Sequence, residues 1–184
     1  MHISSKLART VAATAVAASA MAGTMTLAGP AEAAGNSTKC HSSSRTFALP
    51  GKPDVKLNLS ICAKSWAHGG HRHYRAWLGK ASWSGSSFWI GGKRFSDVSV
   101  HMRLEHGKKA VDNCDNGICT VKTISQAIND NNDGSRSYSS SGYGSLGMIS
   151  KTRGWTAAAS VDVDIANDGR GPRTWELHGT AAVR

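Results

Sequence analysis

The chain has 184 residues, 40% of them hydrophobic, and its 22 lysines and arginines against 12 acidic residues give a net charge of +10. This length fits one domain with a real core, since a chain of about 150 residues buries roughly 70% of its unfolded surface. The sequence has no Gly-x-Ser-x-Gly, His-Glu-x-x-His or phosphate-loop motif. Composition therefore argues against a multidomain protein and against the enzyme classes that these motifs mark.

The first segment is predicted to be a secretory signal peptide. Lys6 and Arg9 precede an apolar run at 11–27, and Ala-Glu-Ala at 31–33 is a small-x-small cleavage site. Residues 1–33 are then removed, and residues 34–184 form a single secreted, extracellular β domain. No later stretch is apolar enough to span a bilayer, so no stable membrane insertion is expected after cleavage.

The positive charge is concentrated in the first half of the mature chain. Residues 34–110 hold 13 basic and three acidic residues, for a net charge of +10, whereas residues 111–184 hold seven basic and eight acidic residues, for a net charge of −1. This asymmetry favours an anionic partner, although a secreted protein also uses charge for solubility.

Four cysteines lie in the mature chain, an even number that predicts two disulfides in an exported protein. Cys114 and Cys119 flank an Asp-Asn-Gly-Ile turn and are expected to pair locally. Cys40 and Cys62 would then form the second bridge. A four-cysteine metal site is the alternative, and its spacing does not match a zinc ribbon.

Residues 55–63 give the clearest strand. Val55, Leu57, Leu59 and Ile61 alternate with polar residues, the period of a half-buried β-strand. The other expected elements follow in chain order: strands at 46–49, 74–83 and 98–105, a cysteine hairpin at 111–122, a turn of helix at 123–129, a surface loop at 130–144, and a long hairpin of strands at 155–165 and 175–183.

Short strands separated by Gly, Pro and Ser turns predict an all-β fold, an antiparallel β-sandwich or barrel of about seven to nine strands with two disulfides. Trp155 and Trp175 fit the inward pattern of the last hairpin and are assigned to the core. Trp77 and Trp83 share a face by simple alternation, opposite Tyr74 and Leu78, and one of them is expected to be exposed.

The basic half also carries most of the tryptophans, and exposed Trp beside Lys or Arg suits sugars and stacked bases. A histidine-rich loop follows the strand at 55–63. The predicted ligand-binding residues are Trp66, His68, His71, Arg72, His73, Arg75, Lys93 and Arg94.

Two candidate metal sites remain open at this point. His71-x-His73 on a strand would place both imidazoles on one face, as a divalent metal needs, but the surroundings are cationic. Residues 129–134 (Asn-Asp-Asn-Asn-Asp-Gly) resemble the start of a Ca²⁺ loop, but Ser140 stands where the bidentate Glu is required. No metal or cofactor is therefore expected.

The terminal hairpin presents acidic side chains outward. Pairing Val163 with Trp175 or with Leu177 would place Asp162, Asp164, Glu176 and His178 on one face. Two carboxylates on one face could serve hydrolysis or hold Ca²⁺. The alternative is a solvated face whose carboxylates pair with cations from the next strand.

The preferred function is a secreted, non-catalytic binding protein that contacts an extracellular polyanion or polysaccharide. A small extracellular hydrolase that uses the histidine loop or the Asp162/Glu176 face is the second hypothesis. The third is a secreted enzyme inhibitor that presents the Cys114–Cys119 loop to a protein target, since a rigid loop lowers the ordering cost of binding.

Overall fold

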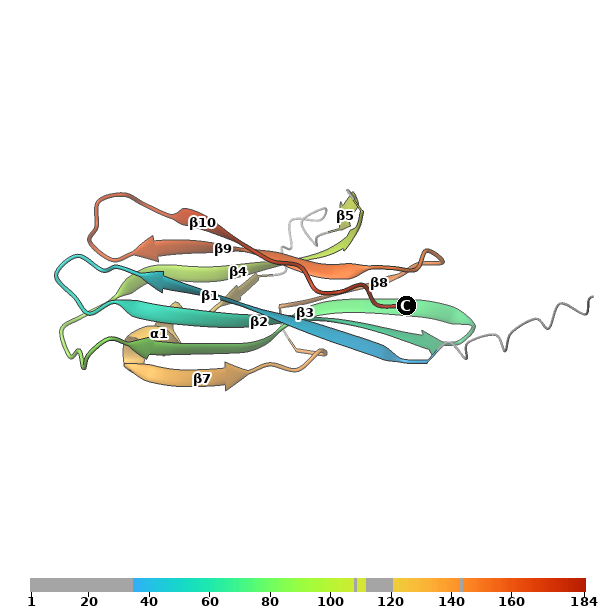
Figure 1. The fold of residues 1–184 in the computed structure, drawn as a ribbon, viewed down its shortest axis with the longest axis horizontal. Coiled ribbons are helices and arrows are strands. Elements are labelled where there is room, and N and C mark those ends of the chain that lie inside the picture. The colour runs from blue at the N-terminus through green and yellow to red at the C-terminus, as the bar shows by residue number, and fades with distance from the viewer. Residues whose placement is uncertain (1–34, 108, 112–120, 143) are drawn as a thin grey trace, which may run out of the picture. The chain divides into compact units, whose positions relative to one another are not determined.

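The computed structural model describes residues 35–107, 109–111, 121–142 and 144–184, which form two antiparallel β-sheets and one short helix (Figure 1). The predicted signal peptide lies outside these residues, as does the predicted Cys114–Cys119 bridge. Eight of the described strands have five or more residues, and two have three.

Sheet A has the strand order β1-β2-β3-β7, and β8 pairs with the other end of β3. Its strands are β1 (Ser37–Phe47), β2 (Val55–His68), β3 (His71–Gly85), β7 (Asp133–Ser137) and β8 (Ser145–Ile149). The β2–β3 turn is the Gly69-Gly70 pair, with positive φ at both residues. This conformation is the one that a two-residue hairpin turn requires and that glycine adopts without strain.

Sheet B has the strand order β10-β9-β4-β5, and β6 also pairs with β4. Its strands are β4 (Phe95–His106), β5 (Lys109–Val111), β6 (Val121–Thr123), β9 (Thr156–Ile165) and β10 (Arg173–Leu177). Helix α1 (Ser125–Asp130) is the turn of helix expected at 123–129. Within the described residues, no helix has the length and apolar character needed to cross a membrane.

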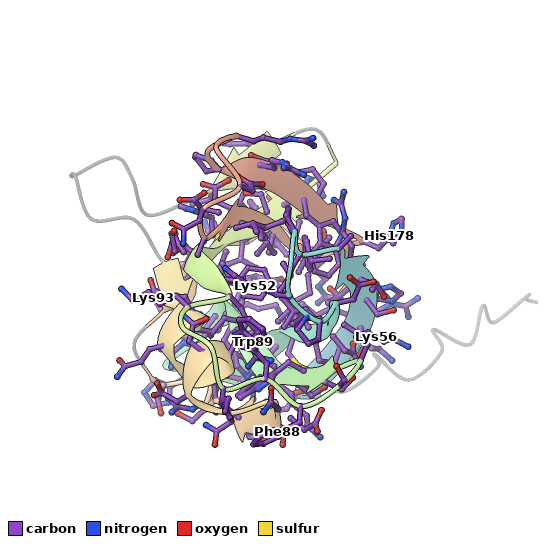
Figure 2. The ribbon with its side chains drawn as sticks, turned by 90° about the vertical axis from the view of Figure 1, so that its left-hand side faces the viewer. Lys52, Lys56, Phe88, Trp89, Lys93 and His178 are labelled. Atoms are coloured by element: carbon purple, nitrogen blue, oxygen red, sulfur yellow. A yellow bond between two sulfur atoms is a disulfide. The ribbon has the colours of Figure 1, made fainter. Side chains whose placement is uncertain are left out.

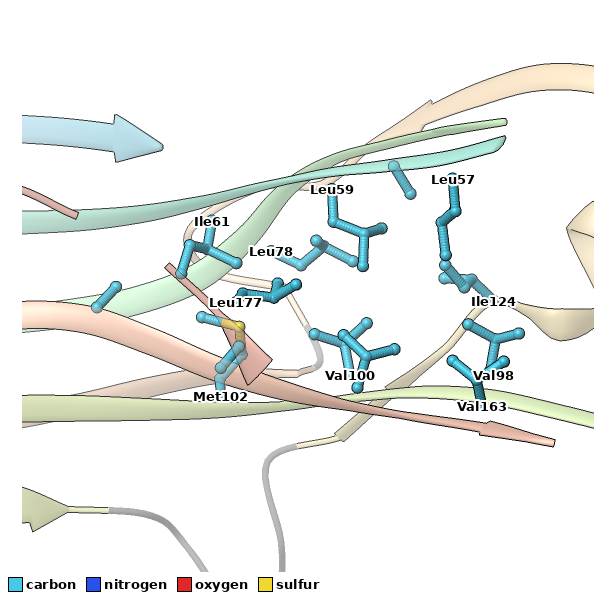
Figure 3. Close-up of a cluster of buried hydrophobic side chains, with 14 of the residues drawn as sticks. Leu57, Leu59, Ile61, Leu78, Val98, Val100, Met102, Ile124, Val163 and Leu177 are labelled. Atoms are coloured by element: carbon cyan, nitrogen blue, oxygen red, sulfur yellow. The ribbon is translucent and has the colours of Figure 1, made fainter. Parts of the chain in front are cut away.

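The two sheets enclose one hydrophobic core (Figure 3). The predicted inward residues of β2 are all buried and face apolar side chains of β4 and β9, such as Val100 and Val163. Trp155 is buried as expected, and Trp175 is partly buried against this core. The predicted all-β antiparallel fold is therefore confirmed, and the arrangement is a sandwich.

A β-bulge in β3 shifts by one residue which side chains face the core. The β2–β3 register pairs Leu78 with Ile61 and Lys80 with Ser60, which leaves Gly79 as an extra residue. Trp77 therefore points to the outer face, which we define as the side of sheet A turned away from sheet B, whereas Trp83 is buried. A Cβ atom at Gly79 would lie 2.7 Å from the Cys62 sulfur, so a side chain there would displace the disulfide.

The Cys40–Cys62 disulfide is confirmed. Its cysteines are direct partners in the β1–β2 register, with their Cα atoms 4.1 Å apart. The bridge joins the edge strand β1 to the centre of the sheet, where Trp77 is the next partner of Cys62.

Removal of this bridge in a Cys40→Ala/Cys62→Ala variant is expected to lower the free energy of unfolding by about 3 kcal/mol. The bridged residues are 22 positions apart, and the chain-entropy model gives a value of this size for such a loop. Urea unfolding of the purified protein measures the difference, and a loss below about 0.5 kcal/mol would show that the bridge does not restrict the unfolded chain.

Tyr74 provides a pH-dependent test of the core. Its side chain is fully buried, burial raises the pKa of its phenol, and its hydroxyl has no hydrogen-bond partner among the described residues. Because the folded pKa exceeds the unfolded value, the neutral phenol contributes stability that is present below about pH 10 and is lost as the pH rises beyond it.

We expect Tyr74→Phe to unfold at the same or a higher urea concentration at pH 7 and to lose less stability than the wild type between about pH 10 and 11. Tyr138, whose pKa burial also raises, is present in both proteins and contributes equally to their remaining pH dependence. Equal losses in the two proteins would contradict this assignment to Tyr74.

The surface loop predicted at 130–144 is wrong in its first part, because β7 pairs there with β3. Tertiary contacts override the weak strand propensity of this Ser- and Asn-rich segment. The Trp83 indole donates to the Asn131 carbonyl, and its ring lies where a side chain at Gly134 would be.

Both registers considered for the terminal hairpin are wrong. The structure pairs Trp175 with Val161 and Arg173 with Val163. The connection at 166–172 includes Asn167 in the left-handed region, and an ion pair between Asp168 and Arg173 closes it. The second strand also ends at Leu177 rather than continuing to residue 183.

Candidate functional site

The turn end of the β2–β3 hairpin gathers cations and aromatic rings on the outer face of sheet A. Three pairs of directly opposed residues alternate outward there: His68 with His71, Trp66 with His73, and Lys64 with Arg75. The period of two that buries the hydrophobic residues of β2 necessarily places the intervening residues on this side.

Trp66 is the centre of this group. Its ring is stacked on the His73 imidazole, with centroids 5.1 Å apart and an angle of 18° between the planes. The Arg75 guanidinium lies 5.5 Å and the Lys64 ammonium 5.9 Å from the ring centroid, within the range of cation–π attraction. The His68 ring lies 5.9 Å from that of His73. We call these five residues the Trp66 cluster.

Strand β8, which pairs with the turn end of β3, helps to hold the Arg75 side chain in place. Gly147 of β8 is the register partner of Arg75, and a Cβ atom at Gly147 would lie 3.5 Å from the Arg75 Nε atom. Arg75 also donates a hydrogen bond to the Ser140 carbonyl at 3.1 Å. These contacts hold the guanidinium over the indole, so the charge is pre-organised rather than mobile.

Cations recur along the rest of the outer face. Lys80 lies opposite Ser60, and Lys56 lies opposite Ser84. Along β2, the cation-bearing residue pairs at positions 64, 60 and 56 are four residues apart, or about 13 Å at the usual rise per residue. Serine and asparagine side chains, such as Asn58 and Ser82, fill the intervening positions.

The charge asymmetry of the sequence becomes an asymmetry between the sheets. The strands of sheet A contain eight lysines and arginines and one aspartate, whereas those of sheet B contain four lysines and arginines and five acidic residues. That aspartate, Asp133, accepts a hydrogen bond from the Gly85 amide at the end of β3 opposite the turn. The Trp66 cluster therefore has no carboxylate on the neighbouring strands.

The structure separates the eight residues predicted to bind a ligand. It brings together Trp66, His68, His73 and Arg75, with exposed His71 at the adjacent turn. Arg72 lies on the inner side of β3, where it donates to the carbonyl of the C-terminal residue Arg184 at 2.6 Å. Lys93 lies on the β3–β4 loop, which follows the other end of β3.

Arg94 is an interior residue, so its assignment to a ligand-binding surface is corrected. It is 1% exposed, and its guanidinium donates to the Ile128 and Asn131 carbonyls and to the Asn132 side chain. Burial lowers the pKa of Arg94, and the Asp133 charge partly opposes this effect. The guanidinium serves to join the β3–β4 loop to the end of α1.

Glu176 and Asp162, two carboxylates of the predicted acidic face, contact side chains of β4. Arg103 donates to Glu176 at 2.9 Å and to Glu105 at 3.1 Å, and His101 lies 3.1 Å from Asp162. Burial alone would lower the pKa of Arg103, but the hydrogen bonds to the two glutamates outweigh it and raise the pKa. This arrangement matches the solvated, cation-paired alternative.

His178 does not join this face, because the chain leaves the sheet after Leu177. Its ring lies instead against His41 of β1, with centroids 6.1 Å apart. Within the described ranges, no three His, Cys, Asp or Glu residues are grouped so as to hold a metal ion.

The Asn-rich segment at 129–134 uses its oxygens for internal contacts. The Asn129 side chain accepts hydrogen bonds from the Arg94 and Phe95 amides, and the Asn132 side chain accepts one from the Trp89 amide. Of the alternate side-chain oxygens that imitate a Ca²⁺ loop, that of Asn129 therefore holds the β3–β4 loop, and that of Asp133 accepts from the Gly85 amide.

Sequence reasoning missed three members of the outer face: Lys64, Trp77 and Lys80. The alternation of β2 could have identified Lys64, because it shares the parity of Trp66. Trp77 and Lys80 lie on either side of the bulge at Gly79, and no sequence pattern fixed its position.

Searches of protein-family models, curated proteins and solved structures found nothing that matches this chain.

Proposed function

We propose that this chain is a secreted, non-catalytic binding protein that holds a linear anionic polymer against the outer face of sheet A. The observation that carries the proposal is the Trp66 cluster, in which Lys64 and Arg75 are held beside one indole ring with no carboxylate on the neighbouring strands. Such a surface provides donors for phosphate, sulfate or carboxylate groups and a ring for the sugar or polyol between them.

The regular spacing of the cation-bearing residue pairs along the outer face favours a polymer over a small anion. From His68 to Lys56, the outer face extends over 12 residue steps of β2, or about 40 Å. A chain lying lengthwise would meet the Trp66 cluster first and then Lys80 and Lys56, with serine hydroxyls between them. Extracellular wall polymers and acidic polysaccharides have this repeating chemistry, and export by the predicted signal peptide would bring the protein to them.

The test is retention of the purified exported protein on insoluble cell wall and on an immobilised acidic polysaccharide across a salt series. About four cationic contacts predict a slope of roughly −3 to −4 in a plot of log K against log salt. Salt-independent retention would reject the polyanion and favour binding through aromatic stacking alone. No retention on either material would reject the proposed function.

A further inference from the structure

We propose that the cleft between the β3–β4 loop and residues 129–133 is a second binding site, which takes an uncharged sugar residue. The cleft is open, has a volume of about 720 Å³, and is lined by Phe88, Trp89, Ile90 and Lys93 on one side and by the Asn/Asp segment on the other. By its place in the chain it follows the end of β3 opposite the Trp66 cluster, and Figure 2 shows three of its lining residues, Phe88, Trp89 and Lys93. The inference goes beyond the proposed function, because both the site and the class of ligand differ.

The apolar wall is unusual for a soluble surface. Phe88 is 79% exposed and Ile90 is 87% exposed, on either side of the partly buried Trp89. Single exposed apolar residues are common, but three adjacent large ones beside a cleft indicate a contact surface.

Trp89, the middle residue of this wall, is held in place by its neighbours. The Asn132 side chain accepts a hydrogen bond from the Trp89 amide at 3.0 Å and donates one to the Trp89 carbonyl at 3.1 Å. The Trp89 indole donates to the Gly92 carbonyl, and its ring lies against Gly91, where a Cβ atom would come within 2.7 Å. Trp89 is therefore presented with little ordering cost on binding.

The opposite wall supplies polar groups that are available to a ligand. In the part of the chain that the structure describes, the Asp130 carboxylate and the Lys93 ammonium make no hydrogen bond or ion pair, and both residues are exposed. By contrast, the amides of Asn129 and Asn132 are occupied by the β3–β4 loop and build the wall. A carboxylate that accepts and an ammonium that donates suit neighbouring hydroxyls of one sugar ring.

The local charge indicates which ligand fits. Lys93, Asp130 and Asp133 give the lining a net charge of −1, which opposes a polyanion or an anionic lipid surface. Aromatic and aliphatic side chains beside a few polar groups, in a cleft of this size, are typical of a site for a small ligand. The apolar face of a neutral sugar meets both requirements.

The experiment is calorimetric titration of the exported protein with neutral tetrasaccharides of glucose, N-acetylglucosamine, mannose, xylose and galactose. A salt concentration of about 0.5 M suppresses binding through the outer face of sheet A. We expect one of these sugars to bind, and Phe88→Ser and Asp130→Asn each to weaken it by about tenfold or more. Ile149→Ser, which changes an exposed apolar residue of β8, and Lys64→Gln/Arg75→Gln should leave the affinity unchanged.

Absence of binding by all five sugars at about 10 mM would overturn the inference, as would binding that both Phe88→Ser and Asp130→Asn leave intact. Phe88 is too exposed for its replacement to threaten folding, and unfolding curves of both variants check this point. Adsorption to neutral phosphatidylcholine vesicles that is lost in Phe88→Ser would assign the loop to a lipid surface and would also overturn the inference. Because the polyanion test uses another face and low salt, the two proposals can fail separately.

Discussion

Replacing Lys64 and Arg75 together with glutamine is expected to weaken binding to an immobilised acidic polysaccharide by at least about tenfold at low salt, and to reduce the salt slope by roughly two. Lys64 and Arg75 are direct partners across the β2–β3 hairpin, and both lie beside the Trp66 ring. Removing both takes away the densest pair of charges on the outer face while leaving its aromatic ring in place.

The matched control is Lys109→Gln/Arg170→Gln. These exposed residues lie on β5 and on the β9–β10 connection of sheet B, and their replacement changes the net charge by the same amount. We expect this variant to bind nearly as well as the wild type. Equal losses in the two variants would show that binding follows net charge and would contradict a site on sheet A.

Arg94→Met is expected to lower the free energy of unfolding by about 3 kcal/mol. The guanidinium is buried and donates to three oxygens, those of the Ile128 and Asn131 carbonyls and the Asn132 side chain. Methionine fills similar space but makes none of these three bonds. The Ile128 carbonyl loses this donor, whereas the Asn131 carbonyl keeps the Trp83 indole and the Asn132 side chain keeps the Trp89 amide. Hydrogen bonds to a charged group contribute about 1.5–3 kcal/mol each. Urea unfolding monitored by far-UV circular dichroism measures the loss.

Lys93→Met is the control, because Lys93 is exposed and adjacent in sequence. Its effect should stay within about 0.5 kcal/mol, the usual range for a surface substitution. If Arg94→Met also changed the free energy of unfolding by so little, the guanidinium would not be the contact that joins α1 to the β3–β4 loop.

Much of the fold could be predicted from the sequence, because its longer strands alternate clearly between apolar and polar residues. Alternation identifies β2 and β9, since the inner faces of Val55, Leu57, Leu59 and Ile61 must be covered while the opposite faces meet water. The Cys40–Cys62 bridge was predictable by elimination among four cysteines. The same alternation indicates why Trp66, His73 and Arg75 share a surface.

The remaining features of the fold depend on a bulge, a buried charge and a strand register that no local sequence pattern predicts. Gly79 shifts the register by one residue, so Trp77 and Trp83 face opposite ways although simple alternation puts them together. Arg94 is charged, which predicts a surface position, but carbonyls brought from the end of α1 allow its burial. The register of β9 with β10 goes with the turn at 166–172, where Asn167 adopts the left-handed region and Asp168 pairs with Arg173. Either register considered from the sequence alone would also have buried Trp175.

The most direct test of the proposed binding on sheet A is a titration of the purified protein with a sulfated oligosaccharide. It is observed through the six tryptophan indole N–H resonances by ¹H–¹⁵N NMR, assigned with Trp→Phe variants. Trp66 and Trp77 lie on the outer face of sheet A, Trp155 lies in the core, Trp175 lies on sheet B, and Trp89 borders the cleft at the other end. We predict that the Trp66 resonance moves most, that of Trp77 follows, and those of Trp155, Trp175 and Trp89 stay in place. A shift of Trp89 or Trp175 without a shift of Trp66 would contradict the proposed binding face.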